Sequence, residues 1–248
     1  ESDNWALKAV AESYASKGKH IITSKIEHHA VLHTCEALER EGYPVTYVSV
    51  DKYGVVNMDE LREAVTDKTA IVAVMFANNE IGTIQPIAQI CEIAHSKGAL
   101  MFTDAVQAVG NIDFDLSTLK VDMLALSGHK IHAPKGIGML FVRKGVVIDN
   151  LIEGGGQERG KRPGTENLPG IMGMAAALDE AIANMEAHTA KVTALRDKLI
   201  AGLAKIPHCV LNGDPVNRLP GNVSFCFEGI EGEALLLLLD AKGVCASS

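Results

Sequence analysis

The sequence predicts an α/β fold with a mainly parallel β-sheet flanked by helices. Segments with a strand pattern alternate with segments of helical periodicity up to residue 142, an order typical of parallel strands joined by helices. Two strand segments, residues 69–76 and 121–126, are largely apolar runs of the kind buried on both faces of a sheet. The composition, 47% hydrophobic and 22% charged over 248 residues, provides enough apolar side chains for a large core.

The predicted elements follow one another regularly. Residues 3–16 have helical periodicity and end before Gly18, which favours a helix stop. Strands are predicted at residues 20–24, 44–50, 69–76, 99–103, 121–126 and 138–142. Helices are predicted between them at residues 28–40, 59–65 and 86–97. Asp59 and Glu60 lie in the first turn of a helix, where the helix dipole favours negative charge, and Pro86 suits a helix start.

The pattern changes after the glycine run at residues 154–156. Residues 171–206 are helical in periodicity, with Asn184 and His188 as candidate positions for a bend. Two short strands and a helix at residues 231–241 follow. We therefore predict a large domain at residues 1–185 and the start of a smaller α+β C-terminal domain at residues 186–248.

Charge and cysteine usage argue against several classes of protein. A formal net charge of −8 without a basic cluster disfavours nucleic acid or an anionic membrane as a partner. The apolar runs are too short to span a bilayer, and no signal-peptide pattern opens the sequence. Five scattered cysteines suit a reducing cytosol, and nine histidines show no ligand spacing that indicates a metal site. We therefore expect a cytoplasmic protein without a metal centre.

Polar clusters follow four of the predicted strands. They lie at residues 24–29, 77–82, 103–107 and 127–130. Because the carboxyl ends of parallel strands meet along one edge of a sheet, these clusters are expected to converge on one crevice. Taken alone, the last cluster is also compatible with an ordinary strand-to-loop junction that carries a solvated lysine. The four together favour a functional site.

The side chains in these clusters match the needs of pyridoxal 5′-phosphate (PLP). Lys130 offers an amine for a Schiff base with the aldehyde, and such a lysine can be desolvated. Asp104 offers a carboxylate for the pyridine nitrogen, and His28 offers a ring to stack on the cofactor.

The remaining groups of the cofactor also find candidate partners. Gln107 or Asn79 can donate to the phenolic oxygen. Ser127 and His129 can supply a hydroxyl and an imidazole N–H to the phosphate.

Seven motifs carry a resemblance to a known family. They are SKIEH (24–28), NNEIG (78–82), TDAVQ (103–107), SGHK (127–130), GGGQERG (154–160), RPGT (162–165) and NVSF (222–225). In order and spacing the chain resembles the cysteine desulfurases of the NifS/IscS kind, which are class V aminotransferase-family enzymes of PLP fold type I. The resemblance implies conversion of L-cysteine to L-alanine, with the sulfur passed through an enzyme persulfide to iron–sulfur cluster assembly or tRNA thiolation.

The resemblance also implies residue roles. Lys130 would form the Schiff base, Asp104 would hold the pyridine nitrogen, and His28 would stack on the ring and transfer protons. The other implied cofactor contacts are Gln107 and Asn79 at the phenolic oxygen, Ser127 and His129 at the phosphate, and Thr165 at the phosphate of a second subunit. The last of these implies a homodimer.

The chain also departs from the family pattern. It resembles an internal piece, because the family's N-terminal segment, its persulfide-forming cysteine and its carboxylate-binding arginine fall outside residues 1–248. Cys245 is expected to be a small buried residue rather than that cysteine, and Glu158 and Arg159 are expected to form a structural ion pair. We therefore expect the fragment itself to be inactive. Alternatives for the parent are a selenocysteine lyase or a non-catalytic dimer or scaffold relative.

Overall fold

The core of the protein is a six-stranded sheet. The computed structural model describes residues 1–247. The strand order is β2-β1-β3-β4-β5-β6, with the first five strands parallel to one another and β6 antiparallel to β5. The strands are β1 (His20–Ser24), β2 (Val45–Val48), β3 (Thr69–Ala73), β4 (Leu100–Asp104), β5 (Met123–Ser127) and β6 (Gly138–Val142). The predicted, mainly parallel α/β fold is confirmed.

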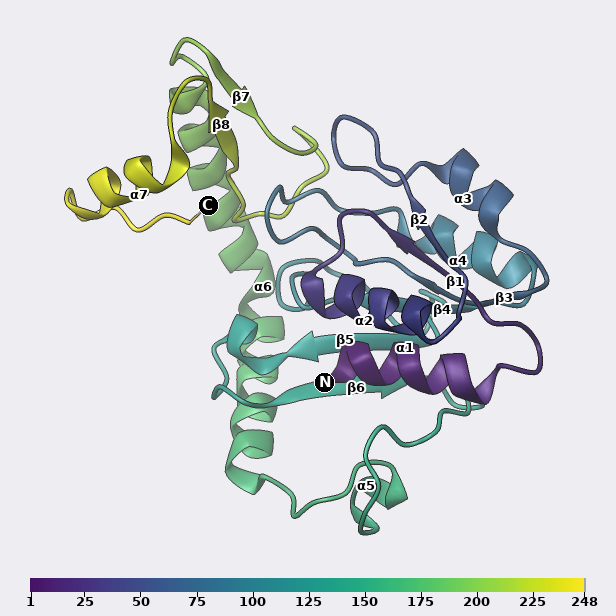
Figure 1. Ribbon diagram of the computed structural model, residues 1–248. Helices are drawn as coiled ribbons and strands as arrows, with labels where there is room; N and C mark the ends of the chain where they lie inside the picture. The colour runs from purple at the N-terminus through teal and green to yellow at the C-terminus, as the bar shows by residue number, and fades with distance from the viewer. Residues whose placement is uncertain (248) are drawn as a thin grey trace.

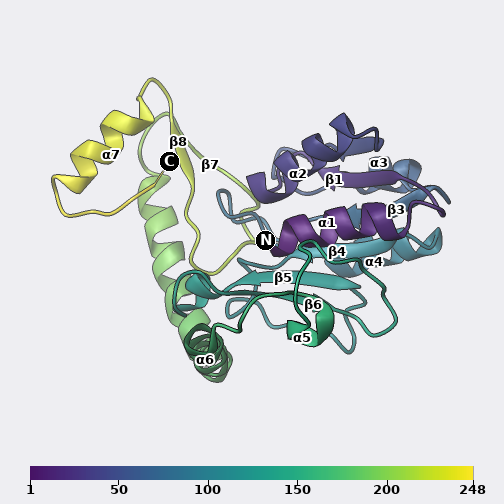
Figure 2. The same cartoon turned by 60° about the horizontal axis from the view of Figure 1, so that its bottom comes forward.

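Helices cover both faces of this sheet (Figures 1 and 2). One face packs against α1 (Ser2–Ser13) and α2 (His29–Arg40), whose buried side chains join those of β1, β3, β4 and β5 in one apolar cluster. The other face packs against α3 (Met58–Ala64), α4 (Ile87–Ser96) and part of α6 (Leu168–Leu203). All five residues of β3 are buried, as expected of a central strand with helices on both sides.

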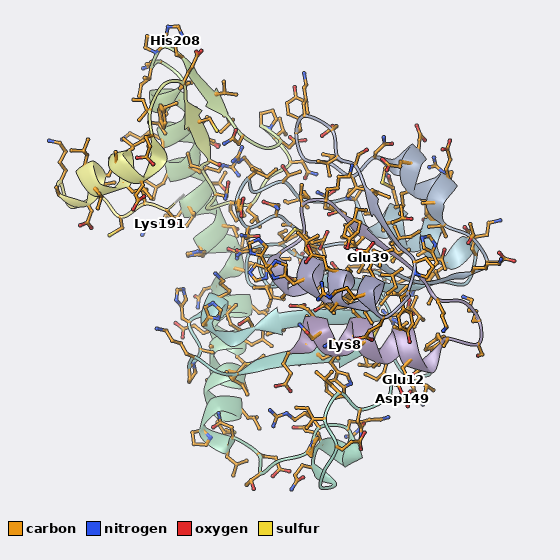
Figure 3. The ribbon with its side chains drawn as sticks, viewed as in Figure 1. Lys8, Glu12, Glu39, Asp149, Lys191 and His208 are labelled. Carbon is orange, nitrogen blue, oxygen red and sulfur yellow. The ribbon has the colours of Figure 1, made fainter. Side chains whose placement is uncertain are left out.

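A second lobe extends away from the sheet. It contains the C-terminal half of α6, the antiparallel pair β7 (Cys209–Leu211) and β8 (Phe225–Phe227), and α7 (Gly232–Asp240). Figure 3 shows Lys191 and His208 in this lobe, apart from the sheet.

The helix α6 runs without interruption through Asn184 and His188, so neither residue breaks it, and the bend proposed there stays a prediction. The Asn184 side chain donates to the carbonyl oxygen of Glu180 at 2.9 Å, and Thr189 donates to that of Met185 at 2.7 Å. Both polar side chains are thus satisfied by the preceding turn of the helix and do not interrupt it. The domain boundary predicted at residue 185 falls inside this helix and stays a prediction.

The segment between β6 and α6 returns to α1 and includes the short helix α5 (Gln157–Gly160). The Ser13 hydroxyl donates to Asp149 Oδ2 at 2.7 Å, and the Trp5 indole donates to the Asp149 carbonyl oxygen at the same distance. Figure 3 shows Asp149 beside Glu12 at the end of α1. These hydrogen bonds hold the segment against α1, whose first turn borders the edge of the sheet.

Two expectations about single residues are wrong. Cys245 is exposed, because neither α7 nor residues 241–247 after it bury a side chain. Glu158 and Arg159 form no ion pair within residues 1–247. Both have left-handed backbone conformations, and Arg162 instead pairs with Glu1 at 2.9 Å.

No helix among residues 1–247 combines the length and hydropathy that crossing a membrane requires. In that same range, no group of three or more His, Cys, Asp or Glu side chains is arranged to hold a metal ion.

Candidate functional site

The carboxyl ends of β1, β3, β4 and β5 meet at one edge of the sheet, where a cavity of about 910 Å³ opens. The predicted site residues that line it are His28, Asn79, Asp104, Gln107, Ser127, His129 and Lys130. Thr165 does not line it, although its neighbours Gly164 and Glu166 do. The predicted convergence of the four strand-end clusters is therefore present in the structure.

The loop after β5 is shaped by close packing. Residues Gly128–Ile131 form a turn of 3₁₀-helix, and the left-handed His132 ends it with a φ of 66°. A Cβ at Gly128 would lie 2.8 Å from Ile137 Cγ2, so only glycine allows this approach. The loop thereby directs Ser127, His129 and Lys130 to one cavity.

Ser127 and His129 are already paired. The Ser127 Oγ lies 2.8 Å from His129 Nδ1. This contact occupies one ring nitrogen of His129 and leaves Nε2 for a ligand. The pair offers the hydroxyl and imidazole groups that suit a phosphate.

Lys130 is exposed on this turn rather than desolvated. The 3₁₀ turn places the side chain at the cavity wall, where it remains open to solvent.

Asp104 is the buried anion of the site. It ends β4 and is only 6% exposed, and its Oδ1 accepts a hydrogen bond from the Val106 N–H at 2.9 Å. Burial raises the pKa of Asp104, against the opposing effects of the Val106 hydrogen bond and of His28. No cationic side chain among residues 1–247 forms an ion pair with it. A buried carboxyl without a cationic partner, facing a cavity, fits the protonated ring nitrogen of PLP.

His28 caps a helix as well as lining the cavity. Its Nδ1 accepts a hydrogen bond from the Ala30 N–H at 3.1 Å, as the N-cap of α2. The hydrogen-bond pattern therefore assigns the proton of the neutral ring to Nε2. The cap fixes the ring at the sheet edge and makes Nε2 its available donor.

Gln107 and Asn79 complete the predicted ring contacts. Among residues 1–247, no intramolecular hydrogen bond engages the side-chain amide of either residue, and both line the cavity. Both amides are therefore available to a ligand.

A family model of the class-V aminotransferases matches residues 1–248, which is the whole chain. The chain belongs to this family.

Individual relatives of the chain within this family are named as cysteine desulfurases. The chain is 57% identical over 248 residues to a cysteine desulfurase IscS of Methanosarcina thermophila, a match that covers 100% of the chain and 61% of that protein. It is 52% identical over 251 residues to a cysteine desulfurase IscS of Clostridium botulinum (strain Hall), with 100% and 63% covered. A solved structure of a NifS-like protein superposes with a TM-score of 0.96 at 43% identity, covering 100% of the chain and 68% of that structure. The chain thus spans about three fifths of the length of these curated relatives.

The cavity also contains a carboxyl that sequence reasoning missed. Asp3, in the first turn of α1, lines the cavity, and its Oδ1 is enclosed without a hydrogen-bond partner among residues 1–247. Burial, and secondarily the charge of Asp104, raise the pKa of Asp3 to about 7. A cation bound near both carboxyls would relieve their mutual repulsion. The only sequence signal was an acid at the start of a helix, which does not show that the helix end lies over the sheet edge.

A further buried carboxyl is that of Glu27, a residue of the cluster at 24–29 to which the sequence assigned no role. Glu27 is buried, with Oε1 accepting from the Ser24 hydroxyl at 2.5 Å and Oε2 accepting from the Met75 N–H at 2.8 Å. These bonds join the end of β1 to the end of β3. Burial raises the pKa of Glu27 to about 8, although both hydrogen bonds oppose the shift.

The raised pKa of Glu27 predicts a pH-dependent stability. The pKa of Glu27 is about 8 in the folded protein, against an ordinary value of 4.5. Its contribution to the free energy of unfolding is therefore fully present below pH 4.5 and is lost as pH rises toward 8. The loss between pH 5 and pH 8 is at most about 4 kcal/mol. In the full-length, cofactor-free protein, Glu27→Gln should raise the urea midpoint at pH 8 much more than at pH 5. An equal effect at both pH values would contradict a protonated Glu27.

Proposed function

We propose that the full-length protein is a PLP-dependent cysteine desulfurase. The observation that carries the proposal is the convergence of Lys130, Asp104 and His28 on one cavity, in a chain that belongs to the class-V aminotransferase family. The high identity to two cysteine desulfurases named IscS supports the choice of reaction within that family.

In this proposal each residue has a physical task. When bound, PLP supplies an electron-withdrawing ring that stabilises negative charge at the Cα of an amino acid. Asp104 holds the ring N–H and thereby keeps that nitrogen protonated. Lys130 binds the cofactor and moves protons at the cavity wall. His28 covers the ring with its Nε2–H available as a donor.

The remaining predicted residues orient the cofactor. Ser127 and His129 bind its phosphate, while Gln107 and Asn79 donate to its phenolic oxygen. We further propose a homodimer in which Thr165 contacts the phosphate bound by the partner subunit. Thr165 is exposed and does not line the cavity described above, which leaves it accessible to a partner subunit.

The substrate and product follow from the proposed reaction. L-Cysteine loses its sulfur to an enzyme thiol, so that a C–S bond breaks, an S–S bond forms and L-alanine leaves. We propose that this thiol lies beyond residues 1–248, because it must be exposed and must reach the substrate, and neither exposed cysteine here, Cys226 or Cys245, lines the cavity. Iron–sulfur cluster assembly or tRNA thiolation would consume the persulfide. The five cysteines in residues 1–247 are unpaired, which supports a reducing, cytoplasmic setting.

The proposal is tested by incubating the full-length, PLP-loaded protein with L-cysteine and a thiol reductant. We expect equal amounts of alanine and sulfide, and less turnover of L-selenocysteine under the same conditions. A preference for selenocysteine would indicate a lyase, and failure to bind PLP or to use either amino acid would indicate a non-catalytic relative.

The 248-residue chain alone should release no sulfide from L-cysteine. We infer this because the nucleophilic thiol is proposed to lie outside the chain. Its PLP binding, followed by the visible absorption of the cofactor, serves as the folding control. Sulfide release by this chain would contradict the prediction.

A further inference from the structure

The motif at residues 222–225 contributes no residue to the cavity. Its first residue nevertheless contacts the loop at residues 78–82, which carries Asn79 and is called the site loop below. The Asn222 side chain donates from Nδ2 to the Glu80 carbonyl oxygen at 3.0 Å and, more weakly, to the Asn79 carbonyl oxygen at 3.5 Å. Its Oδ1 accepts from Arg218 Nη2 at 2.9 Å. Both ends of this amide are therefore engaged, one with the second lobe and one with the site loop.

Arg218 is a buried anchor for this contact. It is 4% exposed. Its guanidinium donates to backbone carbonyl groups of the second lobe and of the loop that carries Asn79. It contacts the carbonyl oxygens of Ile81 at 3.2 Å, Asn222 at 3.2 Å, and Asn212 and Asp214 at 3.1 Å each. The planar, multiply bonded guanidinium holds Asn222 in one orientation.

The backbone of the loop approaches Asn222 closely. Gly82 has a φ of +79°, and a Cβ there would lie 2.6 Å from Asn222 Oδ1. The Leu219 N–H donates to the Gly82 carbonyl oxygen at 2.8 Å, and Arg196 of α6 donates to the Leu219 carbonyl oxygen at 3.1 Å. A continuous set of hydrogen bonds thus runs from α6 to the site loop.

We propose that Asn222, held by Arg218, is a positioning residue that acts through Asn79. It fixes the carbonyl groups of Asn79 and Glu80, and this sets the direction in which the Asn79 side chain enters the cavity. The inference deepens the proposed function and rests on it for the role of Asn79. When a side chain at a reacting site is misplaced, the reaction rate falls, even if the substituted residue that caused the shift does not touch the substrate.

The test is a double-mutant cycle in the full-length, PLP-loaded protein. Asn222→Asp keeps an oxygen for Arg218 but removes the N–H donors to the loop. We expect it to lower kcat/KM for L-cysteine about tenfold in the wild-type background and less than about twofold in an Asn79→Ala background. Asn217→Ala is the matched control. It removes an amide that donates to the Ile84 carbonyl oxygen at 3.3 Å, beyond the site loop, and should change little.

Hydrogen exchange of the Glu80, Ile81 and Gly82 amides in the cofactor-free protein provides a readout that does not depend on turnover. Asn222→Asp should speed it about tenfold, and Asn217→Ala should not. Equal effects of Asn222→Asp in both backgrounds, unchanged exchange, or equal effects of the two substitutions would overturn the proposal. If cysteine is not turned over at all, the proposed function fails, while faster exchange in Asn222→Asp alone would still support the positioning of the loop. If Asn222→Asp does not fold, Asn222→Ser is subjected to the same cycle and the same criteria.

Discussion

Replacing Lys130 with alanine in the full-length protein is expected to lower alanine formation from L-cysteine on the order of a thousandfold. Lys130 is the lysine that the turn after β5 places at the cavity wall beside Ser127 and His129. Its removal takes away both the proposed covalent attachment of the cofactor and the amine that moves protons there. Alanine formation under saturating L-cysteine, with PLP in excess, measures the effect.

Lys135→Ala is the matched control for this substitution. Lys135 is also an exposed lysine of the β5–β6 connection, but it does not line the cavity. Its replacement removes the same charge and should leave the rate within about twofold of wild type, as surface substitutions usually do. A Lys130→Ala protein that keeps a tenth or more of the wild-type rate would rule out the proposed role of Lys130.

Asp104→Asn is expected to lower the same rate about a hundredfold or more. Asparagine keeps an oxygen for the Val106 N–H but lacks the negative charge that holds a protonated ring nitrogen. Because burial disfavours the charged form of Asp104, as its raised pKa shows, the neutral replacement should not destabilise the cofactor-free protein. The rate should therefore fall while the thermal midpoint without PLP stays equal or rises.

Asp113→Asn provides the control for charge alone. Asp113 is exposed on the segment after β4 and does not line the cavity, so its neutral replacement should alter neither quantity. If Asp104→Asn instead left the rate unchanged, or lowered the rate only together with the thermal midpoint, Asp104 would have a structural role and not the proposed electrostatic one.

Much of the fold is predictable because the sheet is central and parallel. Strands buried on both faces appear as apolar runs, and their carboxyl ends are marked by polar residues such as Asp104 and Ser127. Since parallel strands bring these ends to one edge, sequence order alone predicts which side chains meet. The cluster that included Lys130 was ambiguous by itself, and only the other strand ends favoured a site.

The features that were missed depend on contacts between distant segments. Asp3 borders the cavity only because α1 packs across the sheet, and Glu27 is buried only because β1 and β3 are neighbours. Arg218 lies 137 residues from the carbonyl group of Ile81 that it binds. Periodicity describes the surroundings of a residue within one element and carries no such information. The predicted burial of Cys245 was wrong for the same reason, because it depends on what packs against α7 and the residues after it.

The PLP attachment site can be measured directly. The full-length, PLP-loaded protein is reduced with borohydride, which fixes the cofactor to the amine that holds it, and the modified peptide is identified by mass spectrometry. We predict that the label lies on Lys130 and is lost in Lys130→Ala. A label on another lysine, or none on a protein that remains folded, would contradict the proposed site.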